Sequence, residues 1–539
     1  MTPGLEARVD APSRPSDGPA GKDPGAGGRP LLFSVSAPRE KCAALPGAAC
    51  ALPHRRCEGV RTNAAHRAAR MMPLIALCAA HGCVSGPREA MRIDGRFDDW
   101  AGVRPACVDP RGDGGHSGVD FGRVWICDDR DALYFRFDTG KEISLQSRNG
   151  IALYLDTDDS AETGIPVGGI GADVSWRFGA REGVDHRFAP ARIFNAYEAG
   201  MVTGPTVTSR EHEVKMRKDA GTRAVRWLLR DEGDGRGDIA PDQGAAGRYE
   251  FTGAEVTRTG ARPLAKRSAR DVRVVSNNVY EDNIFNREAE FSRILNALAP
   301  DVLALQEIRR HRAAQVAEVV TRMTGGAWHT ADHADCFTLS RYPVLSATKV
   351  AAGIGALLDL PDETYARDLF LVNLHLGAGT KDERRQREVD EVVAALRDLR
   401  APGRPGSLPP GTPIVIVGDL NLVGLARQLA TLLTGDIADE ARFGPDSPPD
   451  WDGTAMTDLA PSHLSAPEAY TWANYHRRGF GPGRIDYVIY ADSAVAVANR
   501  FVLSTDTMSD ADLAAGGLRR DDTRTASDHL PVVADLVLP

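Results

Sequence analysis

The sequence predicts a two-domain protein in which an all-β domain precedes a domain of mixed α/β (α+β) type. The chain has 539 residues, more than a single hydrophobic core usually organises. Residues 91–255 alternate strand patterns with turns rich in Asp. From residue 272 onwards, apolar strand runs alternate instead with segments whose apolar residues recur at helical spacing. This second alternation is typical of sheets flanked by helices.

The first 90 residues differ in character from both domains. Residues 1–70 are rich in Gly, Pro, Ala and Arg without sustained periodicity, so we expect them to be disordered. The apolar run Met71–Ala80 follows several arginines and leads into Gly82 and Cys83. Residues 71–90 therefore resemble a secretory signal with a bacterial lipoprotein cleavage site. The resemblance implies a lipid on Cys83 and a start codon assigned too far upstream. The alternative is a short apolar patch in a disordered tail.

Such a signal predicts an exported protein. It would be secreted, periplasmic or attached to the cell envelope through the lipid on Cys83. The apolar run is too short to span a bilayer by itself.

The predicted β domain, residues 91–255, begins with the string IDGRFDDW at 93–100 and carries IALYLDTDDSAETG at 151–164. It resembles the family 9-like carbohydrate-binding modules, which implies a β-sandwich and a glycan ligand. Four acidic residues offer oxygen ligands to Ca²⁺, namely Asp156, Asp158, Asp159 and Asp173. The alternative is an Asp-rich turn at a strand end. The tryptophans of this domain either stack on sugar rings or fill the core, which is more usual for so large an apolar surface.

Residues 256–271 contain an Arg-Pro pair and several basic residues, and are predicted to be the linker to a domain at 272–539. Two helices are expected there. Asn286 is the expected cap of the first, whose apolar stripe is Phe291, Ile294, Leu295 and Leu298. Thr380 and Glu383 form a capping-box pattern before the second, whose apolar stripe is Val389, Val392, Val393, Leu396 and Leu399.

Polar side chains stand at the ends of successive apolar runs in this domain. The runs are expected to be strands: Val272–Val279, Val302–Gln306, Leu369–Leu374, Pro413–Val417, Ile485–Tyr490 and Val532–Leu538. The polar residues at or beside these ends are Asn278, Glu307, His375, Asp419, Asn421, Asp486, Asp528 and His529. Burying each of them without a partner would cost roughly 1–3 kcal/mol. The repeated pattern therefore indicates one shared site, and these side-chain types suit a metal-assisted attack of water on phosphorus.

Seven strings occur in a fixed order between residues 276 and 536. They are SNNV (276–279), LALQEI (303–308), LSRYPV (339–344), VNLHLGAG (372–379), IVIVGDLN (414–421), RIDYVIY (484–490) and SDHLPVVADL (527–536). In this order they resemble the endonuclease/exonuclease/phosphatase superfamily, which includes deoxyribonucleases and bacterial sphingomyelinases. The resemblance covers about half of the chain. It implies a four-layer α/β/β/α sandwich and a metal-dependent phosphoesterase.

The resemblance also implies which residues bind the metal and the water. Glu307, assisted by Asn278 and Asp528, would hold Mg²⁺ or, in its place, Mn²⁺. Asp419 would orient or deprotonate the attacking water. Asn421 would donate a hydrogen bond to a phosphoryl oxygen as charge builds there.

Two histidines complete the implied site. His529, paired with Asp486, would act as a general base or stabilise the transition state. His375 matches the histidine that deoxyribonucleases and sphingomyelinases place beside the scissile phosphate. Arg341 either contacts phosphate or forms a structural ion pair.

The charge of the domain bears on its substrate. Residues 270–539 hold 27 Lys and Arg against 38 Asp and Glu, a balance of −11, in a chain of formal net charge −9. A surface that binds duplex DNA normally carries a basic stripe, so the composition disfavours DNA relative to a lipid head group or a small phosphate ester. Two other functions stay open, an extracellular nuclease and a glycan-binding surface protein whose second domain has lost catalysis.

Overall fold

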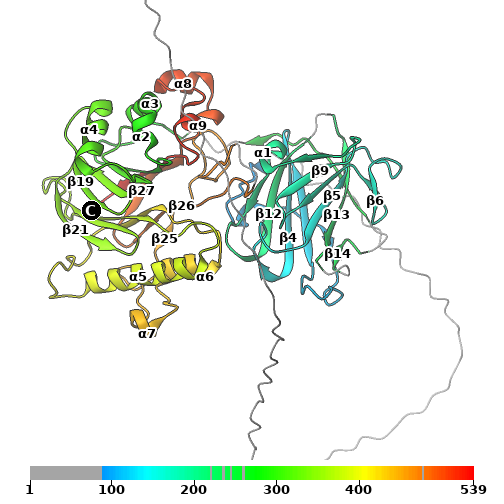
Figure 1. Cartoon of the computed structure of the whole chain (residues 1–539), viewed down its shortest axis with the longest axis horizontal. Helices are drawn as coiled ribbons and strands as arrows, with labels where there is room; N and C mark the ends of the chain where they lie inside the picture. Colours follow the sequence, from blue (N-terminus) through cyan, green and yellow to red (C-terminus); the bar gives the residue numbers. More distant parts are fainter. Residues whose placement is uncertain (1–87, 219–220, 234–236, 243–245, 258–261, 476–478) are drawn as a thin grey trace, which may run out of the picture. The chain divides into compact units, whose positions relative to one another are not determined.

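The computed structural model describes residues 88–218, 221–233, 237–242, 246–257, 262–475 and 479–539 (Figure 1). The expected disorder of residues 1–70, the signal-like segment up to residue 87 and the lipid site at Cys83 lie outside these ranges and stay predictions. Within the ranges, no helix has both the length and the apolar character needed to cross a bilayer.

Residues 88–257 form mainly strands, most of them in two antiparallel sheets. The first sheet has the order β11 (Val202–Gly204), β12 (Ser209–Arg217), β4 (Ala132–Ile143), β3 (Arg123–Asp128) and β2 (Pro105–Val108). The second has the order β10 (Arg192–Phe194), β9 (Glu182–Asp185), β8 (Val174–Arg177), β5 (Ile151–Asp156), β13 (Ala224–Asp231) and β14 (Ile239–Ala240), with β15 (Gly247–Glu250) also on β13. Smaller elements are the hairpin of β6 (Ile165–Val167) and β7 (Ile170–Ala172), the 3₁₀ helix η1 (Asp98–Trp100) and the helix α1 (Ala196–Ala199).

The core of this part contains side chains from both sheets. Apolar residues of β3, β4 and β12 pack with those of β5, β8 and β13 in one buried cluster. Trp176 and Trp227 belong to this cluster, and Trp100 and Trp125 belong to a neighbouring one. All four are at most 8% exposed. These tryptophans therefore fill the core, and the sugar-stacking alternative is wrong for them.

The predicted linker begins with a strand. β16 (Val256–Thr257) pairs in parallel with β1 (Arg88–Glu89), so the two ends of this part of the chain meet. Strands of two residues are too short to show a hydrophobic period, and the sequence therefore did not predict either of them.

His212 makes the stability of the protein sensitive to acid. The side chain lies in β12, buried beside Phe137. Burial lowers the pKa of His212 from its ordinary value of 6.5 to about 4. The imidazole therefore binds a proton more tightly in the unfolded chain than in the folded one. The contribution of His212 to the free energy of unfolding is complete above pH 6.5 and is lost as the pH falls towards 4. We expect a loss of roughly 3 kcal/mol by pH 4, largely absent in His212→Phe. Denaturant unfolding of the wild type and of His212→Phe at pH 7 and pH 4.5 measures this loss. An equal loss of unfolding free energy in both proteins would contradict the role of His212.

Residues 262–539 form two six-stranded sheets. One has the order β19 (His329–His333), β20 (Cys336–Ser340), β18 (Val302–Gln306), β17 (Val272–Asn278), β28 (Val532–Val537) and β27 (Ala496–Val502). The other has the order β21 (Val344–Val350), β22 (Gly353–Leu358), β23 (Leu369–His375), β24 (Ile414–Asp419), β26 (Asp486–Tyr490) and β25 (Thr457–Asp458). Each sequence-predicted strand of this domain corresponds to one of these strands, within a few residues at its ends.

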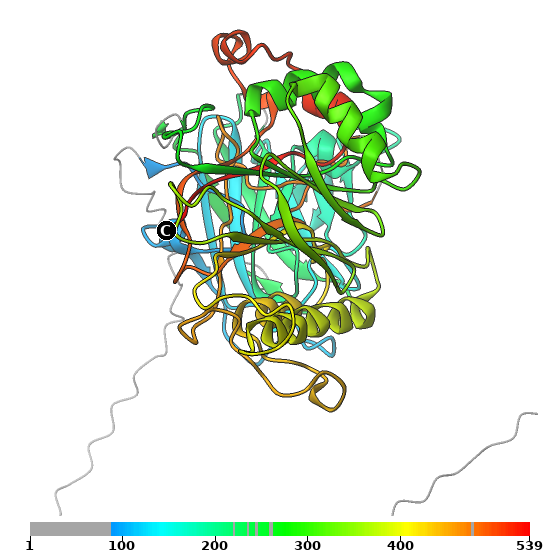
Figure 2. The same cartoon turned by 90° about the vertical axis from the view of Figure 1, so that its left-hand side faces the viewer.

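Helices cover the outer side of each sheet (Figures 1 and 2). The inner faces share a buried cluster to which β17, β18 and β28 contribute from one sheet and β22, β23, β24 and β26 from the other. The helices α3 (Glu288–Leu298) and α4 (Ala313–Thr324) pack on the outer face of the first sheet. The helices α5 (Asp382–Arg400) and α6 (Ala426–Thr434) pack on that of the second. This part of the chain is thus of mixed α/β type.

Shorter helices lie in the connections. They are α2 (Asn283–Asn286), α7 (Glu440–Phe443), α8 (Asp510–Gly516), α9 (Asp522–Ala526) and the 3₁₀ helix η2 (Thr505–Thr507).

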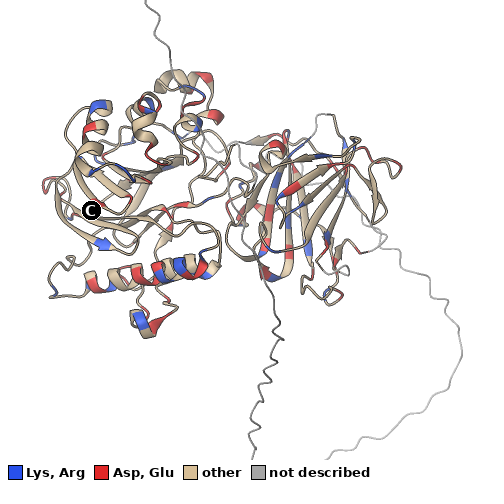
Figure 3. Ribbon diagram, viewed as in Figure 1, with Lys and Arg blue, Asp and Glu red and all other residues tan. Residues whose placement is uncertain are grey.

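Both predicted apolar stripes are buried except for the half-buried Leu399, but the predicted caps are wrong. Asn286 ends α2 instead of capping α3, whose N-cap position is Arg287. The N-cap position of α5 is Lys381 and not Thr380, and its side chain makes no capping hydrogen bond. Acidic side chains in the first turn of α5 take over part of this role, because they interact favourably with the helix dipole. The ribbon of this helix in Figure 3 carries acidic and basic residues interleaved along its length.

Strand pairing brings the predicted site residues to one edge of each sheet. In the first sheet β17 and β18 run parallel, with Asn278 opposite Gln306, so that Glu307 follows at the same edge. In the second sheet β23 and β24 run parallel, with His375 opposite Asp419. The antiparallel strand β26 starts at this edge, because Asp486 stands opposite Asp419.

Candidate active site

Gly418 allows β24 to deliver Asp419 beside β23. Its φ of +132° is one that side chains rarely adopt, and a Cβ at this position would lie 2.0 Å from the carbonyl oxygen of Leu374. Only glycine is compatible with so close an approach of two backbones. The glycine of the GDLN string is therefore needed for the position of the aspartate that follows it.

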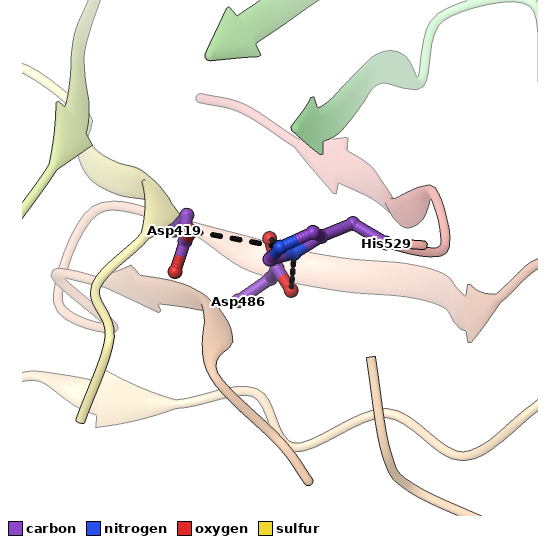
Figure 4. Close-up of side chains that lie close together, drawn as sticks. All are labelled: Asp419, Asp486 and His529. Carbon is purple, nitrogen blue, oxygen red and sulfur yellow. Dashed lines mark hydrogen bonds and ion pairs between the residues drawn. The ribbon is translucent and has the colours of Figure 1, made fainter. Parts of the chain in front are cut away.

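Three of the predicted residues meet in a buried cluster, shown in Figure 4. Nδ1 of His529 lies 2.9 Å from Oδ2 of Asp486, and its Nε2 lies 3.7 Å from Oδ2 of Asp419. Asp486 thereby orients the imidazole, with Nδ1 towards itself and Nε2 towards Asp419. The side chains come from β26, from β24 and from the segment before β28, so residues far apart in sequence build the cluster.

Two residues of the cluster, His529 and Asp419, have pKa values far from their ordinary ones. Burial acts to lower the pKa of His529, but the carboxylates of Asp486 and Asp419 outweigh it and raise that pKa to about 10. Burial raises the pKa of Asp419 to about 6, although His529 opposes the shift. At neutral pH the imidazole is therefore protonated and the Asp419 carboxylate is mostly ionised.

A second histidine–carboxylate pair lies on another side of Asp419. Nδ1 of His375 is 2.9 Å from Oδ2 of Asp335, and its Nε2 is 3.7 Å from Oδ2 of Asp419. Burial acts to lower the pKa of His375, but Asp335 and Asp419 raise it above its ordinary value. The hydrogen bond from His375 lowers the pKa of Asp335 despite the burial of that carboxyl group. One oxygen of Asp419 thus has two imidazoles at the same distance, each held by its own carboxylate.

Oxygen-bearing side chains of β17 and β18 lie at this edge as well. The amide nitrogen of Asn278 donates to Oδ2 of Asp419 at 3.0 Å, and its Oδ1 accepts from the backbone of Tyr280. Oε2 of Glu307 accepts from the backbone N–H of Glu281 at 3.0 Å. The guanidinium of Arg309 lies 3.4 Å from Oε1 of Glu307 and 3.8 Å from Oδ2 of Asp335.

The backbone around these oxygens is strained. Five non-glycine residues of this region have positive φ: Tyr280, Glu281, Asp282, Glu307 and Asn421. Each such residue costs about 1–3 kcal/mol, and residues of this kind cluster at functional sites. The strain therefore supports a functional role for this edge.

Asp528 supplies an oxygen that the protein does not satisfy. Its Oδ2 accepts from the indole N–H of Trp472 at 3.1 Å, whereas its buried Oδ1 has no hydrogen-bond partner among the described residues. A buried carboxylate oxygen of this kind suits a cation. Glu307 and Asn278 offer further side-chain oxygens of the kind that hard divalent cations prefer.

Asn421 is buried beside Asp419. Its backbone N–H donates to Oδ1 of Asp419, and its side-chain amide donates to the carbonyl of Leu376 at 3.2 Å. An amide has a second N–H, which is the group that the predicted contact with a phosphoryl oxygen requires.

Arg341 does not lie with these residues, which corrects the prediction of a phosphate contact. β20 runs antiparallel to β18 and pairs Ser340 with Val302, so Arg341 follows at the opposite edge of the sheet. There it donates to the carbonyl of Gly325 and stacks over Trp328 at 3.8 Å. Its role is structural, although its partners are carbonyls and a ring instead of the expected ion pair.

The predicted calcium ligands are only partly together. Carboxylate oxygens of Asp156, Asp158 and Asp173 lie within 4.8 Å of one another. Asp156 Oδ2 and Asp173 Oδ1 are buried and lack hydrogen-bond partners in the described part of the chain. Asp159 is not part of the group, because it forms ion pairs with Arg226 and Arg248 instead.

The sequence did not predict Asp335 and Arg309. Asp335 stands in the tight turn between β19 and β20, and Arg309 follows Glu307 by two residues. Neither lies at the end of a long apolar run, which was the signal used for the others. An acidic residue in the turn before an apolar strand was a visible signal for Asp335, but it is common in exposed turns.

The site and the fold define a metal-dependent hydrolase that acts on phosphoester bonds. Residues 278–529 match the Endonuclease/Exonuclease/phosphatase family, a span slightly under half of the chain. No curated protein matches the chain.

Several solved structures match about half of the chain. Sphingomyelinase C from Streptomyces griseocarneus matches with 14% identity and a TM-score of 0.29, over 49% of this chain and 99% of that one. SmcL matches with 14% identity and a TM-score of 0.28, over 50% and 99%. A mutant beta toxin from Staphylococcus aureus with bound magnesium ions matches with 14% identity and a TM-score of 0.27, over 49% and 99%.

Proposed function

We propose that this protein is an exported Mg²⁺-dependent phosphodiesterase that hydrolyses its substrate by direct attack of water. One observation carries the proposal: Oδ2 of Asp419 lies 3.7 Å from Nε2 of both His529 and His375. A buried carboxylate between two carboxylate-held imidazoles offers a proton acceptor and two cationic donors in one small volume. That is the set of groups that in-line displacement at a phosphodiester needs.

The protonation states assign roles among these groups. Asp419 is the residue that orients the water and accepts its proton, because its carboxylate is mostly ionised at neutral pH. The carboxylates of Asp486 and Asp419 raise the pKa of His529, which favours its protonated form and not the role of the base. His529 instead stabilises the charge that builds on a phosphoryl oxygen, with Asn421 as a second donor.

His375 is placed to assist the leaving group. Asp335 and Asp419 raise the pKa of His375, which favours its protonated form near neutral pH. A protonated imidazole can give its proton to the departing alkoxide and is then neutral.

Glu307, Asn278 and Asp528 are the residues that would hold Mg²⁺, or Mn²⁺ in its place. When bound, the cation supplies positive charge that neutralises the phosphoryl oxygens and helps to align the substrate. Arg309, close to both Glu307 and Asp335, adds a fixed positive charge at the same edge.

We propose a four-layer α/β/β/α sandwich for residues 272–539 and a β-sandwich that binds a glycan for residues 91–255. Ca²⁺ held by Asp156, Asp158 and Asp173 would stabilise the latter. Export through the signal-like segment, with a lipid on Cys83, would place the enzyme at the cell envelope. The negative balance of the C-terminal half favours a lipid head group or another small diester over duplex DNA.

The test is Mg²⁺-dependent hydrolysis by the full-length protein. The substrates are bis-p-nitrophenyl phosphate, p-nitrophenyl phosphate, sphingomyelin and plasmid DNA. We expect hydrolysis of diesters that stops when the metal is chelated. Preference for DNA, with a steep loss of binding at higher salt, would identify a nuclease instead. No hydrolysis by a folded protein that binds Mg²⁺ and a glycan would favour the non-catalytic alternative.

Asp335→Asn tests the role of the second histidine pair. An amide holds the imidazole but no longer favours its protonated form, so we expect kcat for bis-p-nitrophenyl phosphate to fall by roughly 10²-fold. The alkaline limb of the pH–rate profile should also move to lower pH, because the pKa of His375 falls. Asp332→Asn, on the exposed face of β19, is the matched control. An unchanged profile in Asp335→Asn would show that Asp335 does not tune His375.

A further inference from the structure

A second group of carboxylates lies among the strands of residues 88–257, and none of its members was predicted as a ligand. The five residues are Asp109, Asp113, Asp120, Asp238 and Asp242. Carboxylate oxygens of Asp109, Asp113 and Asp242 lie within 4.8 Å of one another, and so do those of Asp113, Asp120 and Asp238. Asp113 belongs to both triads, which makes the five a single cluster.

Asp109 is buried in this cluster without a partner. The residue is 3% exposed, and neither of its carboxylate oxygens has a hydrogen-bond partner among the described residues. The strongest charges that act on it are the other four carboxylates. Arg111 lies 3.9 Å from the Asp120 carboxylate and donates to the backbone carbonyl of Asp120 and to Asp138, but it is not among the strongest charges that act on Asp109. A buried carboxylate surrounded by carboxylates is costly unless a cation joins it.

The cluster joins the edges of the two sheets. Asp109 directly follows β2, the edge strand of the first sheet, and Asp238 directly precedes β14, an edge strand of the second. Asp242 follows β14 by two residues. One further contact spans the same gap, since Asp238 accepts a hydrogen bond from the backbone of Phe121. Whatever binds the carboxylates therefore holds the two edges together.

We propose that these carboxylates form a Ca²⁺ site that fastens β2 to β14. Two oxygens on one Ca²⁺ at 2.3–2.6 Å can be at most about 5 Å apart, in agreement with the spacing of both triads. Ca²⁺ takes 6–8 oxygen ligands in flexible geometry, so the carboxylates of a triad can supply part of its shell, and backbone carbonyls and water the rest. Mg²⁺ demands a near-ideal octahedron and keeps several waters, so it suits this crowded set less well.

The site is separate from the others in the protein. It shares no residue with the group Asp156, Asp158 and Asp173, nor with the candidate active site. Its role is structural, so its loss should change stability and the number of bound Ca²⁺ ions, while the chemistry at His529 continues.

The experiment uses the full-length protein and Ca²⁺ as the probe. Equilibrium dialysis counts the bound ions in the wild type, in Asp109→Asn and in the control Asp131→Asn, whose exposed carboxylate lies outside the cluster. We expect Asp109→Asn to bind one ion fewer than the wild type and Asp131→Asn to bind the same number. In millimolar Ca²⁺ we expect Asp109→Asn to have a Tm lower by roughly 5 °C.

Removal of Ca²⁺ with a chelator distinguishes a role of Asp109 as a Ca²⁺ ligand from a purely structural role. Without Ca²⁺ the order of the two Tm values should reverse. Asp109→Asn should then melt at or above the Tm of the wild type, because the substitution removes an unpartnered buried charge. An unchanged ion count together with an unchanged Ca²⁺-dependent rise in Tm would overturn the proposal. If Asp109→Asn fails to fold, Asp113→Asn replaces it, because Asp113 is exposed and belongs to both triads. The same two readouts then decide.

Discussion

His529→Ala is expected to lower kcat for a phosphodiester by about 10³-fold or more, the largest effect on activity that we predict. The variant removes a buried cation that is held by Asp486 and aimed at the oxygen of Asp419. Groups that act in proton transfer or in charge stabilisation typically contribute 10²–10⁴-fold each. KM should change little, because the imidazolium acts mainly as charge develops on the phosphoryl group.

Two further variants make this expectation specific. Asp486→Asn keeps the shape of the pair but removes the charge that raises the pKa of His529, so we expect a comparable fall in kcat and a loss of rate beginning at lower pH. His329→Ala changes an exposed histidine of β19 and should leave kcat unaltered. A rate within tenfold of the wild type in His529→Ala would rule out the role that we assign to this residue.

Arg273→Met is expected to cost roughly 3–5 kcal/mol of unfolding free energy, the largest effect on stability that we predict. Arg273 and Asp535 are 1% and 0% exposed and form a double hydrogen bond, with distances of 2.6 and 2.8 Å, between the central strands β17 and β28. Removal of the guanidinium leaves the Asp535 carboxylate buried without a partner. It also removes donors to the carbonyls of Leu264 and Leu298.

The double variant distinguishes an unpaired charge from lost packing. Arg273→Met combined with Asp535→Leu places apolar groups at both positions, so we expect it to be more stable than either single variant. Denaturant unfolding of the full-length protein gives the comparison. Arg322→Met removes an exposed pair with Glu288 and should leave the midpoint unchanged. The explanation fails if the double variant loses as much unfolding free energy as the two single variants lose together.

Much of the candidate site followed from local sequence. Apolar runs of five to eight residues are long enough to show strands, and the polar residue at or beside the end of each run is visible because it interrupts the pattern. The structure places Glu307, Asp419 and His529 at such ends, on one edge of their sheets. Helix caps were less accessible to this reasoning, because the short α2 occupies the position where α3 was expected to begin.

The sequence by itself determined the mixed α/β character of residues 272–539 and the positions of six of their twelve strands, and the resemblance implied the pairing of His529 with Asp486. These features depend on hydrophobic periodicity and on an ordered set of strings, both of which are properties of the chain read in one dimension. Only the tertiary structure decided that Asp335 holds His375, that Arg341 lies at the far edge of its sheet and that five aspartates meet between β2 and β14. The physical reason is that these contacts join segments through strand order and register. Register across a sheet is set by the packing of the whole domain and not by the residues that it brings together.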